Sequence, residues 1–211
     1  MTSPNIIIAD YGLGNLHSVQ HICAYLGFEA IVSSDPEQLL KANAIILPGV
    51  GAFGDAIKNL RNRGLDKALI EFIGSGKPFM GVCLGMQLLF SESEEFGNHR
   101  GLGIIEGSIK KFSAGKKVPQ IAWNSICETK NGASWKDSPL KSLRSGEHMY
   151  FVHSYYARPV EQSVALCETS YADTLYCSAI LRNNIFAVQF HPEKSAVKGI
   201  EIYRNWLSGI K

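Results

Sequence analysis

The sequence predicts an α/β fold with a largely parallel central sheet flanked by helices and additional antiparallel strands in the C-terminal half. Over the first ninety residues, short runs that are apolar on both faces alternate with helical patterns, which indicates a parallel sheet covered on both sides. From Gly103 onward the pattern changes to successive β-type runs. Because 45% of the 211 residues are hydrophobic and no linker-like segment interrupts them, we expect one domain over residues 1–211.

The elements of the N-terminal half follow from apolar spacing and turn residues. Residues 5–10 form a β-rich run, and after a Gly-rich turn the apolar residues recur at helical spacing, at Val19, Ile22, Cys23 and Leu26. Asp35 stands in front of Pro36 as the N-cap of the next helix. The other elements expected here are strands over 28–33, 44–47 and 78–82, and helices over 36–42, within 55–73 and over 84–90.

The C-terminal half is predicted to contain antiparallel strands and hairpins, followed by a last helix. The β-type runs cover residues 104–112, 120–129, 148–157, 164–168, 175–182 and 185–190, and Asn183-Asn184 is expected to form a tight turn. Residues 196–208 have a helical pattern with one apolar stripe, made by Ile200, Tyr203, Trp206, Leu207 and Ile210.

Charge and hydropathy exclude several classes of function. A net charge of +2 is too small for the positive field that nucleic-acid binding requires. The longest apolar stretches, 6–9 and 44–53, fall short of the ~20 residues that span a bilayer, and the first is too short for a signal peptide. The five cysteines include no C-x-x-C pair, which favours free thiols. We therefore expect a cytoplasmic protein that binds neither nucleic acid nor membrane.

The segment Gly81-Val82-Cys83-Leu84-Gly85 lies where a predicted strand meets a predicted helix, as in a nucleophile elbow. Residues two before and two after the nucleophile crowd together on such a turn, which favours Gly81 and Gly85. The helix that follows presents free N–H groups and a positive dipole end to the sulfur. Cys83 is therefore the predicted nucleophile, and the N–H of Leu84 is a predicted oxyanion donor.

A base and its orienting carboxylate are predicted in His191-Pro192-Glu193, directly after the run 185–190. In extended chain, residues i and i+2 point to the same side, so that the Glu193 carboxylate can reach the His191 ring. A second oxyanion donor is expected from Val50 or Gly51, in the loop after the third strand. Cysteine-dependent acyl transfer needs no cofactor, and no set of residues with the spacing of a metal site is found.

Two sets of motifs resemble a known family. The run Gly-Val-Cys-Leu-Gly-Met-Gln at 81–87 and His-Pro-Glu at 191–193 resemble class I glutamine amidotransferases, which hydrolyse glutamine and deliver the ammonia to a synthase. Within this class, the runs 10–16, 48–53, 101–107, 123–124 and 151–155 resemble glutaminase subunits of imidazole glycerol phosphate synthase, over nearly the whole chain. The resemblance implies the class I fold, L-glutamine as substrate, and a heterodimer with the cyclase subunit in histidine biosynthesis.

The resemblance also implies roles for individual residues. Cys83, His191 and Glu193 would form the catalytic triad. The residues that would hold the substrate are Gln87, Glu95, His153, Ser154 and Tyr155. For Gln87 the chemistry agrees, because it follows Cys83 by about one helical turn and its amide can both donate and accept hydrogen bonds.

Other functions remain open on the sequence alone. The family usually has glycine before Trp-Asn, where this chain has Ala122, so the partner could be a different ammonia-using synthase, such as one that amidates sugars for surface polysaccharides. A stand-alone α/β cysteine hydrolase would share the elbow but would ignore free glutamine. A catalytically silent binding module would tolerate the loss of the thiol.

Overall fold

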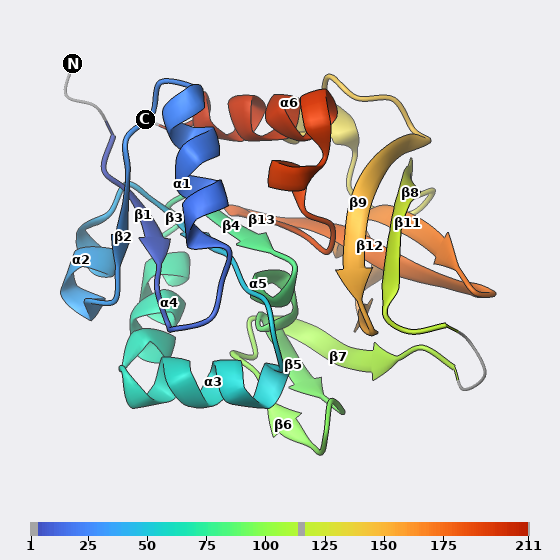
Figure 1. Ribbon diagram of the computed structural model, residues 1–211, viewed down its shortest axis with the longest axis horizontal. Coiled ribbons are helices and arrows are strands. Elements are labelled where there is room, and N and C mark those ends of the chain that lie inside the picture. Colours follow the sequence, from blue (N-terminus) through green and yellow to red (C-terminus); the bar gives the residue numbers. More distant parts are fainter. Residues whose placement is uncertain (1–3, 114–116, 211) are drawn as a thin grey trace.

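The computed structural model describes residues 4–113 and 117–210 (Figure 1). Its N-terminal elements are β1 (Ile6–Ala9), α1 (Leu16–Tyr25), β2 (Ala30–Ser33), α2 (Pro36–Lys41), β3 (Ala44–Leu47), α3 (Phe53–Asn62), α4 (Leu65–Gly74), β4 (Phe79–Val82) and α5 (Leu84–Gln87). The later elements are β5 (Phe90–Ser93), β6 (His99–Arg100), β7 (Ile105–Lys111), β8 (Gln120–Glu128), β9 (Glu147–His153), β10 (Tyr155–Pro159), β11 (Ala165–Tyr171), β12 (Thr174–Arg182), β13 (Ile185–Val188) and α6 (Ala196–Leu207). These elements confirm the predicted α/β class.

The strands form a mixed sheet in the order β2-β1-β3-β4-β13-β12-β10-β7-β5-β6, and β11, β8 and β9 continue from β12 in a branch. Strands β2, β1, β3 and β4 are parallel, as expected from their apolar runs. Alternate strand residues face two different cores. Ile7 and Ile45 pack with α2, α3 and α4, whereas Ile8 and Ile46 pack with α1 and α6 on the other face.

Local signals set several helix ends correctly. The Asp35 carboxylate accepts a 2.9 Å hydrogen bond from the N–H of Glu37, which caps α2 as predicted. In α6, the apolar stripe turns Tyr203, Trp206 and Leu207 into the core. Among the residues described, no helix combines the length and the apolar content that a membrane span requires.

The helix predicted over 84–90 is wrong in its length. Helix α5 ends at Gln87, and Phe90 begins strand β5. The carbonyl of Leu88 accepts a hydrogen bond from Leu102, and the carbonyl of Leu89 accepts from Ile104 and Ile105. A short apolar run is compatible with either a helix or a strand, and here backbone pairing with a distant segment ends the helix after one turn.

The expected antiparallel strands of the C-terminal half are accompanied by two parallel pairings. Strand β5 is parallel to β7, and β13 is antiparallel to β12 but parallel to β4. The Asn183–Asn184 turn folds β13 back onto β12, and the other edge of β13 then pairs with β4. As a result, the carboxyl ends of β4 and β13 lie at the same edge of the sheet.

The single strand predicted over 148–157 is two strands. Ser154 separates β9, which pairs with β8, from β10, which pairs with β7 and β12. The break allows the chain to leave one branch of the sheet and enter the other. It also places His153, Ser154 and Tyr155 beside the ends of β4 and β13.

Candidate active site

Cys83 lies on a strained turn between β4 and α5. Its φ of +55° and ψ of −111° are rare for a residue with a side chain. A Cβ on Gly81 would lie 3.0 Å from the carbonyl oxygen of Gly85, and a Cβ on Gly85 would lie 1.8 Å from the carbonyl oxygen of Leu47. Gly85 is therefore required by direct steric contact between the elbow and β3, and a side chain at position 81 would be tightly crowded within the elbow.

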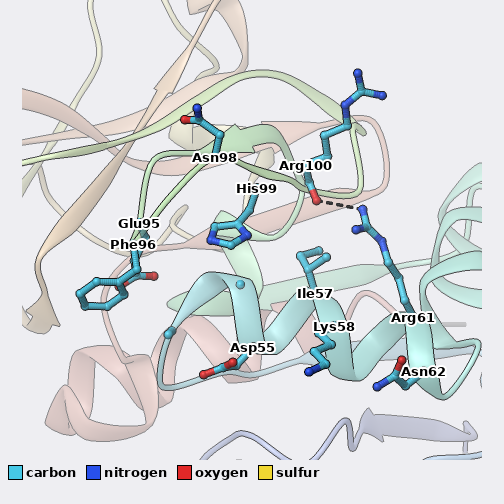
Figure 2. Close-up of a pocket in the computed structure, with 12 residues that line it drawn as sticks. Asp55, Ile57, Lys58, Arg61, Asn62, Glu95, Phe96, Asn98, His99 and Arg100 are labelled. Atoms are coloured by element: carbon cyan, nitrogen blue, oxygen red, sulfur yellow. Dashed lines mark hydrogen bonds between the residues drawn. The ribbon is translucent and has the colours of Figure 1, made fainter.

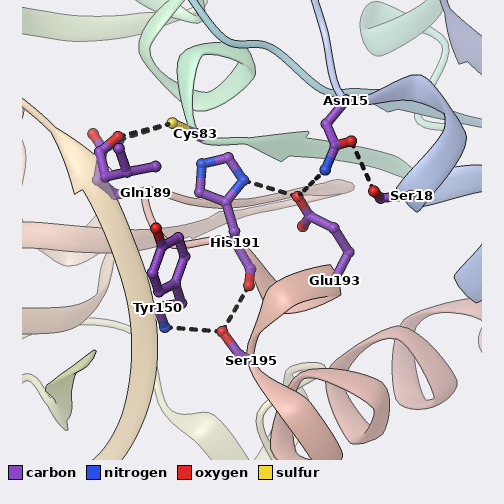
Figure 3. Close-up of polar contacts among 9 residues, drawn as sticks. Asn15, Ser18, Cys83, Tyr150, Gln189, His191, Glu193 and Ser195 are labelled. Carbon is purple, nitrogen blue, oxygen red and sulfur yellow. Dashed lines mark hydrogen bonds and ion pairs between the residues drawn. The ribbon is translucent and has the colours of Figure 1, made fainter. Parts of the chain in front are cut away.

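The parallel register of β4 and β13 brings His191 and Glu193 to this turn. Val82 is paired with Val188, and the N–H of Cys83 donates a 2.7 Å hydrogen bond to the Val188 carbonyl. Nδ1 of His191 lies 2.8 Å from Oε1 of Glu193, and both side chains are almost completely buried. Figure 3 shows the imidazole between Cys83 and Glu193.

The environment of His191 favours its protonated form. Burial lowers the pKa of His191, but the negative charge of Cys83 and the bond with Glu193 outweigh this effect and raise the pKa above its ordinary value. Nε2 has no hydrogen-bond partner among the described residues and lies on the side of the ring that faces Cys83 (Figure 3). A base with a free nitrogen toward the sulfur and a carboxylate behind it has the arrangement of a Cys–His–Glu triad.

Three residues outside the predicted set hold this arrangement in place. Nδ2 of Asn15 donates a 3.3 Å hydrogen bond to Oε1 of Glu193. The Ser195 hydroxyl donates to the His191 carbonyl at 2.6 Å (Figure 3), and the N–H of His191 donates to the Tyr150 carbonyl at 2.9 Å. Asn15 belongs to the run 10–16 that carried the family resemblance, so the sequence marked its position but not its contact.

A cavity of about 170 Å³ opens beside Cys83. The lining includes every predicted site residue except His191 and Glu193, which lie behind the sulfur. It consists of Val50, Gly51, Cys83, Leu84, Gln87, Glu95, Val152, His153, Ser154 and Tyr155. The structure thus gathers side chains from the elbow, the β3 loop and the β9–β10 break around one pocket.

Two buried side chains of this pocket, a glutamine and a histidine, converge on one carbonyl. Nε2 of Gln87 donates a 3.0 Å hydrogen bond to the Tyr155 carbonyl, and Nδ1 of His153 lies 2.8 Å from the same oxygen. Nε2 of His153 lies 3.1 Å from the Tyr176 hydroxyl. Burial lowers the pKa of His153 to about 4, so the ring is neutral and both of its nitrogens are engaged by the protein.

Comparison with known proteins identifies the family. The family model described as "Glutamine amidotransferase class-I" matches residues 7–208. The chain belongs to the class I glutamine amidotransferase family. It is 48% identical to the imidazole glycerol phosphate synthase subunit HisH of Chlorobium luteolum, over 95% of this chain and 98% of the relative. It is 44% identical to the HisH subunit of Aquifex aeolicus, over 95% and 94% of the two chains.

Solved structures agree with this amidotransferase fold. PurLQS from Thermotoga maritima matches with a TM-score of 0.73 at 18% identity, over 100% of both chains. A structure described as a glutamine amidotransferase, also from Thermotoga maritima, matches with a TM-score of 0.63 at 12% identity, over 99% of this chain and 82% of that one.

In this amidotransferase, Glu95 is more than a solvated acidic residue. Its carboxylate accepts a 2.7 Å hydrogen bond from the N–H of Phe53, the first residue of α3. Burial raises the pKa of Glu95, although the bond from Phe53 opposes the shift. Glu95 also lines a larger cavity of about 630 Å³ between α3 and β6, in which the His99 ring faces the helix (Figure 2). The carboxylate thus lies where the two cavities adjoin.

The predicted oxyanion donors lie close to one another in the wall of the pocket. The N–H of Leu84 donates a long, 3.4 Å hydrogen bond to the Gly49 carbonyl. Val50 and Gly51 follow in the same loop and line the pocket, and both are exposed. The Tyr11 hydroxyl anchors this loop with a 2.9 Å hydrogen bond to the Pro48 carbonyl.

Proposed function

We propose that this chain hydrolyses the side-chain amide of L-glutamine at Cys83 and delivers the ammonia to the cyclase subunit of imidazole glycerol phosphate synthase, in histidine biosynthesis. The observation that carries the proposal is the buried Cys83–His191–Glu193 arrangement at the end of a pocket sized for one amino acid. The 48% identity to a HisH subunit supports the same function. We expect the reaction to require no cofactor and to take place in the cytoplasm.

The chemistry divides amide hydrolysis into two steps. Sγ of Cys83 attacks the amide carbon, and the carbon–nitrogen bond breaks as His191 protonates the departing ammonia. Water that gives a proton to His191 then attacks the thioester, which releases glutamate and restores the thiol. Glu193 keeps Nδ1 of His191 protonated and stabilises the imidazolium in both steps.

Negative charge on the tetrahedral intermediates would be held by backbone N–H groups. The backbone N–H of Leu84 supplies one donor. In the intermediate it would bond to the oxyanion instead of the Gly49 carbonyl, its acceptor in the free protein. The loop with Val50 and Gly51 supplies a second donor. Each such donor typically lowers the barrier by about 2.7–4 kcal/mol.

The remaining pocket residues suit a zwitterionic amino acid. The Glu95 carboxylate and the carbonyl oxygen of Gln87 are acceptors for the substrate ammonium. His153 is neutral, and both of its ring nitrogens are hydrogen-bonded within the protein. Together with Ser154 and Tyr155, at the break between β9 and β10, it therefore forms part of the pocket wall.

Strand β8 offers a surface for the synthase partner. Ile121 and Trp123 are 61% and 51% exposed, on either side of Ala122. The Trp123 ring lies 6.3 Å from the Tyr150 ring, which lies 6.4 Å from the His191 ring. A partner docked on these apolar side chains would therefore be separated from the triad only by the rings of Trp123 and Tyr150. At that distance it could receive ammonia by a path shielded from water.

The experiment measures glutamate formed from glutamine when the chain is combined with the cyclase subunit. We expect glutamate release, and we expect Cys83→Ala to abolish it while partner binding and ammonia-driven synthesis remain. Absence of glutamate from the wild-type complex would count against the proposal. Unchanged glutaminase activity in Cys83→Ala would eliminate the proposed nucleophile.

The same assay, repeated with other synthase partners and with peptide or ester substrates, separates the rival functions. A chain that binds no cyclase but serves a sugar-modifying synthase would support the alternative partner. Hydrolysis of peptides or esters without free-glutamine activity would support a stand-alone cysteine hydrolase.

A further inference from the structure

Gln189 is a completely buried polar residue with no role in the mechanism above. It is the first residue after β13, and its exposed fraction is 0%. Its Nε2 donates a hydrogen bond to Sγ of Cys83 at 3.6 Å, and its Oε1 accepts a 2.8 Å hydrogen bond from Nε2 of Gln87 (the Cys83 contact is drawn in Figure 3). One side-chain amide thus contacts both the sulfur and a residue of the substrate pocket.

The contact with Gln87 determines what that residue offers to a ligand. A glutamine Nε2 carries two N–H donors. In Gln87, one donates to the Tyr155 carbonyl at 3.0 Å and the other to Oε1 of Gln189 at 2.8 Å. Because both donors are used inside the protein, the carbonyl oxygen of Gln87 is the group left for the pocket, and it accepts hydrogen bonds, as a substrate ammonium requires.

The contact with Cys83 acts on the nucleophile. A hydrogen bond from a neutral amide to sulfur stabilises the thiolate more than the thiol, because the acceptor is then charged. It also fixes the direction of the sulfur on the elbow. Sγ also lies 4.0 Å from the Val152 carbonyl oxygen, to which the thiol can donate.

We propose that Gln189 is a positioning residue, which holds the Cys83 sulfur in its reactive form and turns the acceptor of Gln87 toward the substrate. The proposal rests on the function proposed above, with Cys83 as the nucleophile. The amide is suited to both tasks because it has a donor on one atom and an acceptor on the other.

Two substitutions separate the two tasks. Gln189→Glu keeps an acceptor for Gln87 but removes the donor to sulfur and adds a negative charge beside it. Gln189→Met has a similar length and removes both hydrogen bonds. Gln120→Met is the matched control, because Gln120 is also 0% exposed but bonds to the Tyr176 hydroxyl and does not line the pocket.

The first measurement is the rate of alkylation of Cys83 by iodoacetamide against pH, followed by mass spectrometry of the Cys83 peptide. His191 and Tyr11 interact with the charge of Cys83, and His153 and Glu95 line its pocket; all four are unchanged in the variants. We expect the midpoint of the profile to rise by about one pH unit in both Gln189 variants and to stay in place in Gln120→Met.

The second measurement is glutamine hydrolysis by the complex with the cyclase subunit. We expect kcat to fall about tenfold or more in both Gln189 variants. KM should rise in Gln189→Met and stay near the wild-type value in Gln189→Glu, which still orients Gln87. A change of fold would move the melting temperature and both kinetic constants of Gln189→Glu together, and that result would overturn the proposal.

An alkylation profile that is the same in wild type and Gln189→Glu would also overturn the proposal. Should Gln189→Met fail to fold, the isosteric Gln189→Glu carries the test by itself. Failure of the proposed function is a separate result, because a wild-type complex without glutaminase activity leaves the alkylation comparison fully informative about Gln189.

Discussion

Asn15 and Glu193, 178 residues apart in the sequence, are joined by a 3.3 Å hydrogen bond from Nδ2 to Oε1. The same carboxylate oxygen lies 2.8 Å from Nδ1 of His191. Asn15 is in turn held by Ser18, whose hydroxyl donates to Oδ1 at 2.7 Å. Asn15, at the start of α1, therefore holds the Glu193 carboxylate in place, and Glu193 in turn orients the proposed base His191.

Replacing Asn15 tests this link. In Asn15→Leu, Glu193 loses one of its donors and can rotate away from His191, so we expect kcat for glutamine to fall about tenfold with little change in KM. Asn205→Leu is the control, because Asn205 also donates through Nδ2 but to Pro139 and Ser142, remote from the triad. Equal kinetic constants in Asn15→Leu and wild type would show that Glu193 needs no such support.

Replacement by alanine is expected to affect stability very differently at Gly85, in the elbow, and at Gly74, outside it. In Gly85→Ala, the new Cβ would lie 1.8 Å from the Leu47 carbonyl oxygen, so the loss of stability should be about 3 kcal/mol or more, with loss of glutaminase activity. In Gly74→Ala, at the end of α4, the new Cβ meets open space, and stability should change little or rise by less than about 1 kcal/mol. Urea unfolding of both variants measures the difference.

The two neighbouring acidic residues Glu94 and Glu95 are expected to respond differently. Glu95→Gln retains an acceptor for the Phe53 N–H but loses the charge that we propose binds the substrate ammonium, so KM for glutamine should rise about tenfold or more. Glu94→Gln removes an exposed ion pair with Lys110 and should leave KM unchanged, because such surface pairs contribute little. Steady-state kinetics of the two variants would refute the role of Glu95 if their KM values agreed.

His153 predicts an acid-dependent loss of stability. Its pKa is about 4 in the folded protein because burial disfavours the charged ring, against an ordinary value of 6.5. The unfolded state therefore binds the proton more readily, so this contribution to stability is complete above pH 6.5 and is lost as the pH falls toward 4, by up to about 3 kcal/mol.

Chemical denaturation from pH 7 to pH 4 measures this dependence. The loss of stability should be smaller in His153→Gln, which has no titrating ring. Parallel stability curves for the variant and the wild type would mean that His153 does not titrate as its burial implies.

We expect the exposed apolar side chains on β8 to contribute to the affinity for the cyclase subunit. Trp123→Ala should weaken binding to the cyclase by about 2 kcal/mol or more, as expected for a tryptophan anchor in an interface. Ile70→Ala, on the exposed face of α4, removes a side chain that is 46% exposed and should leave the affinity unchanged. Isothermal titration calorimetry measures both, and equal affinities would place the partner elsewhere.

The sequence by itself determined the features that depend on near neighbours. Buried strands followed from their apolar runs, the cap of α2 from Asp35, and the elbow from two glycines at fixed distances from Cys83. The contact between His191 and Glu193 was predicted correctly from their spacing, but not for the expected reason, because Pro192–Lys194 forms a short 3-10 helix rather than extended chain. Apart from the contact of Gly85 with Leu47 on β3, each of these depends on steric or hydrogen-bonding constraints within a few residues.

Only the tertiary structure decided which distant segments meet. The parallel pairing of β13 with β4 places Gln189 against Cys83, and no local pattern marks that glutamine as different from other buried polar residues. The same holds for Asn15 at Glu193 and for the end of α5 after one turn. The backbone groups at a strand edge and the side-chain donors can pair with any suitable group that the fold places nearby. These contacts therefore depend on the order of all the strands in the sheet rather than on any one segment.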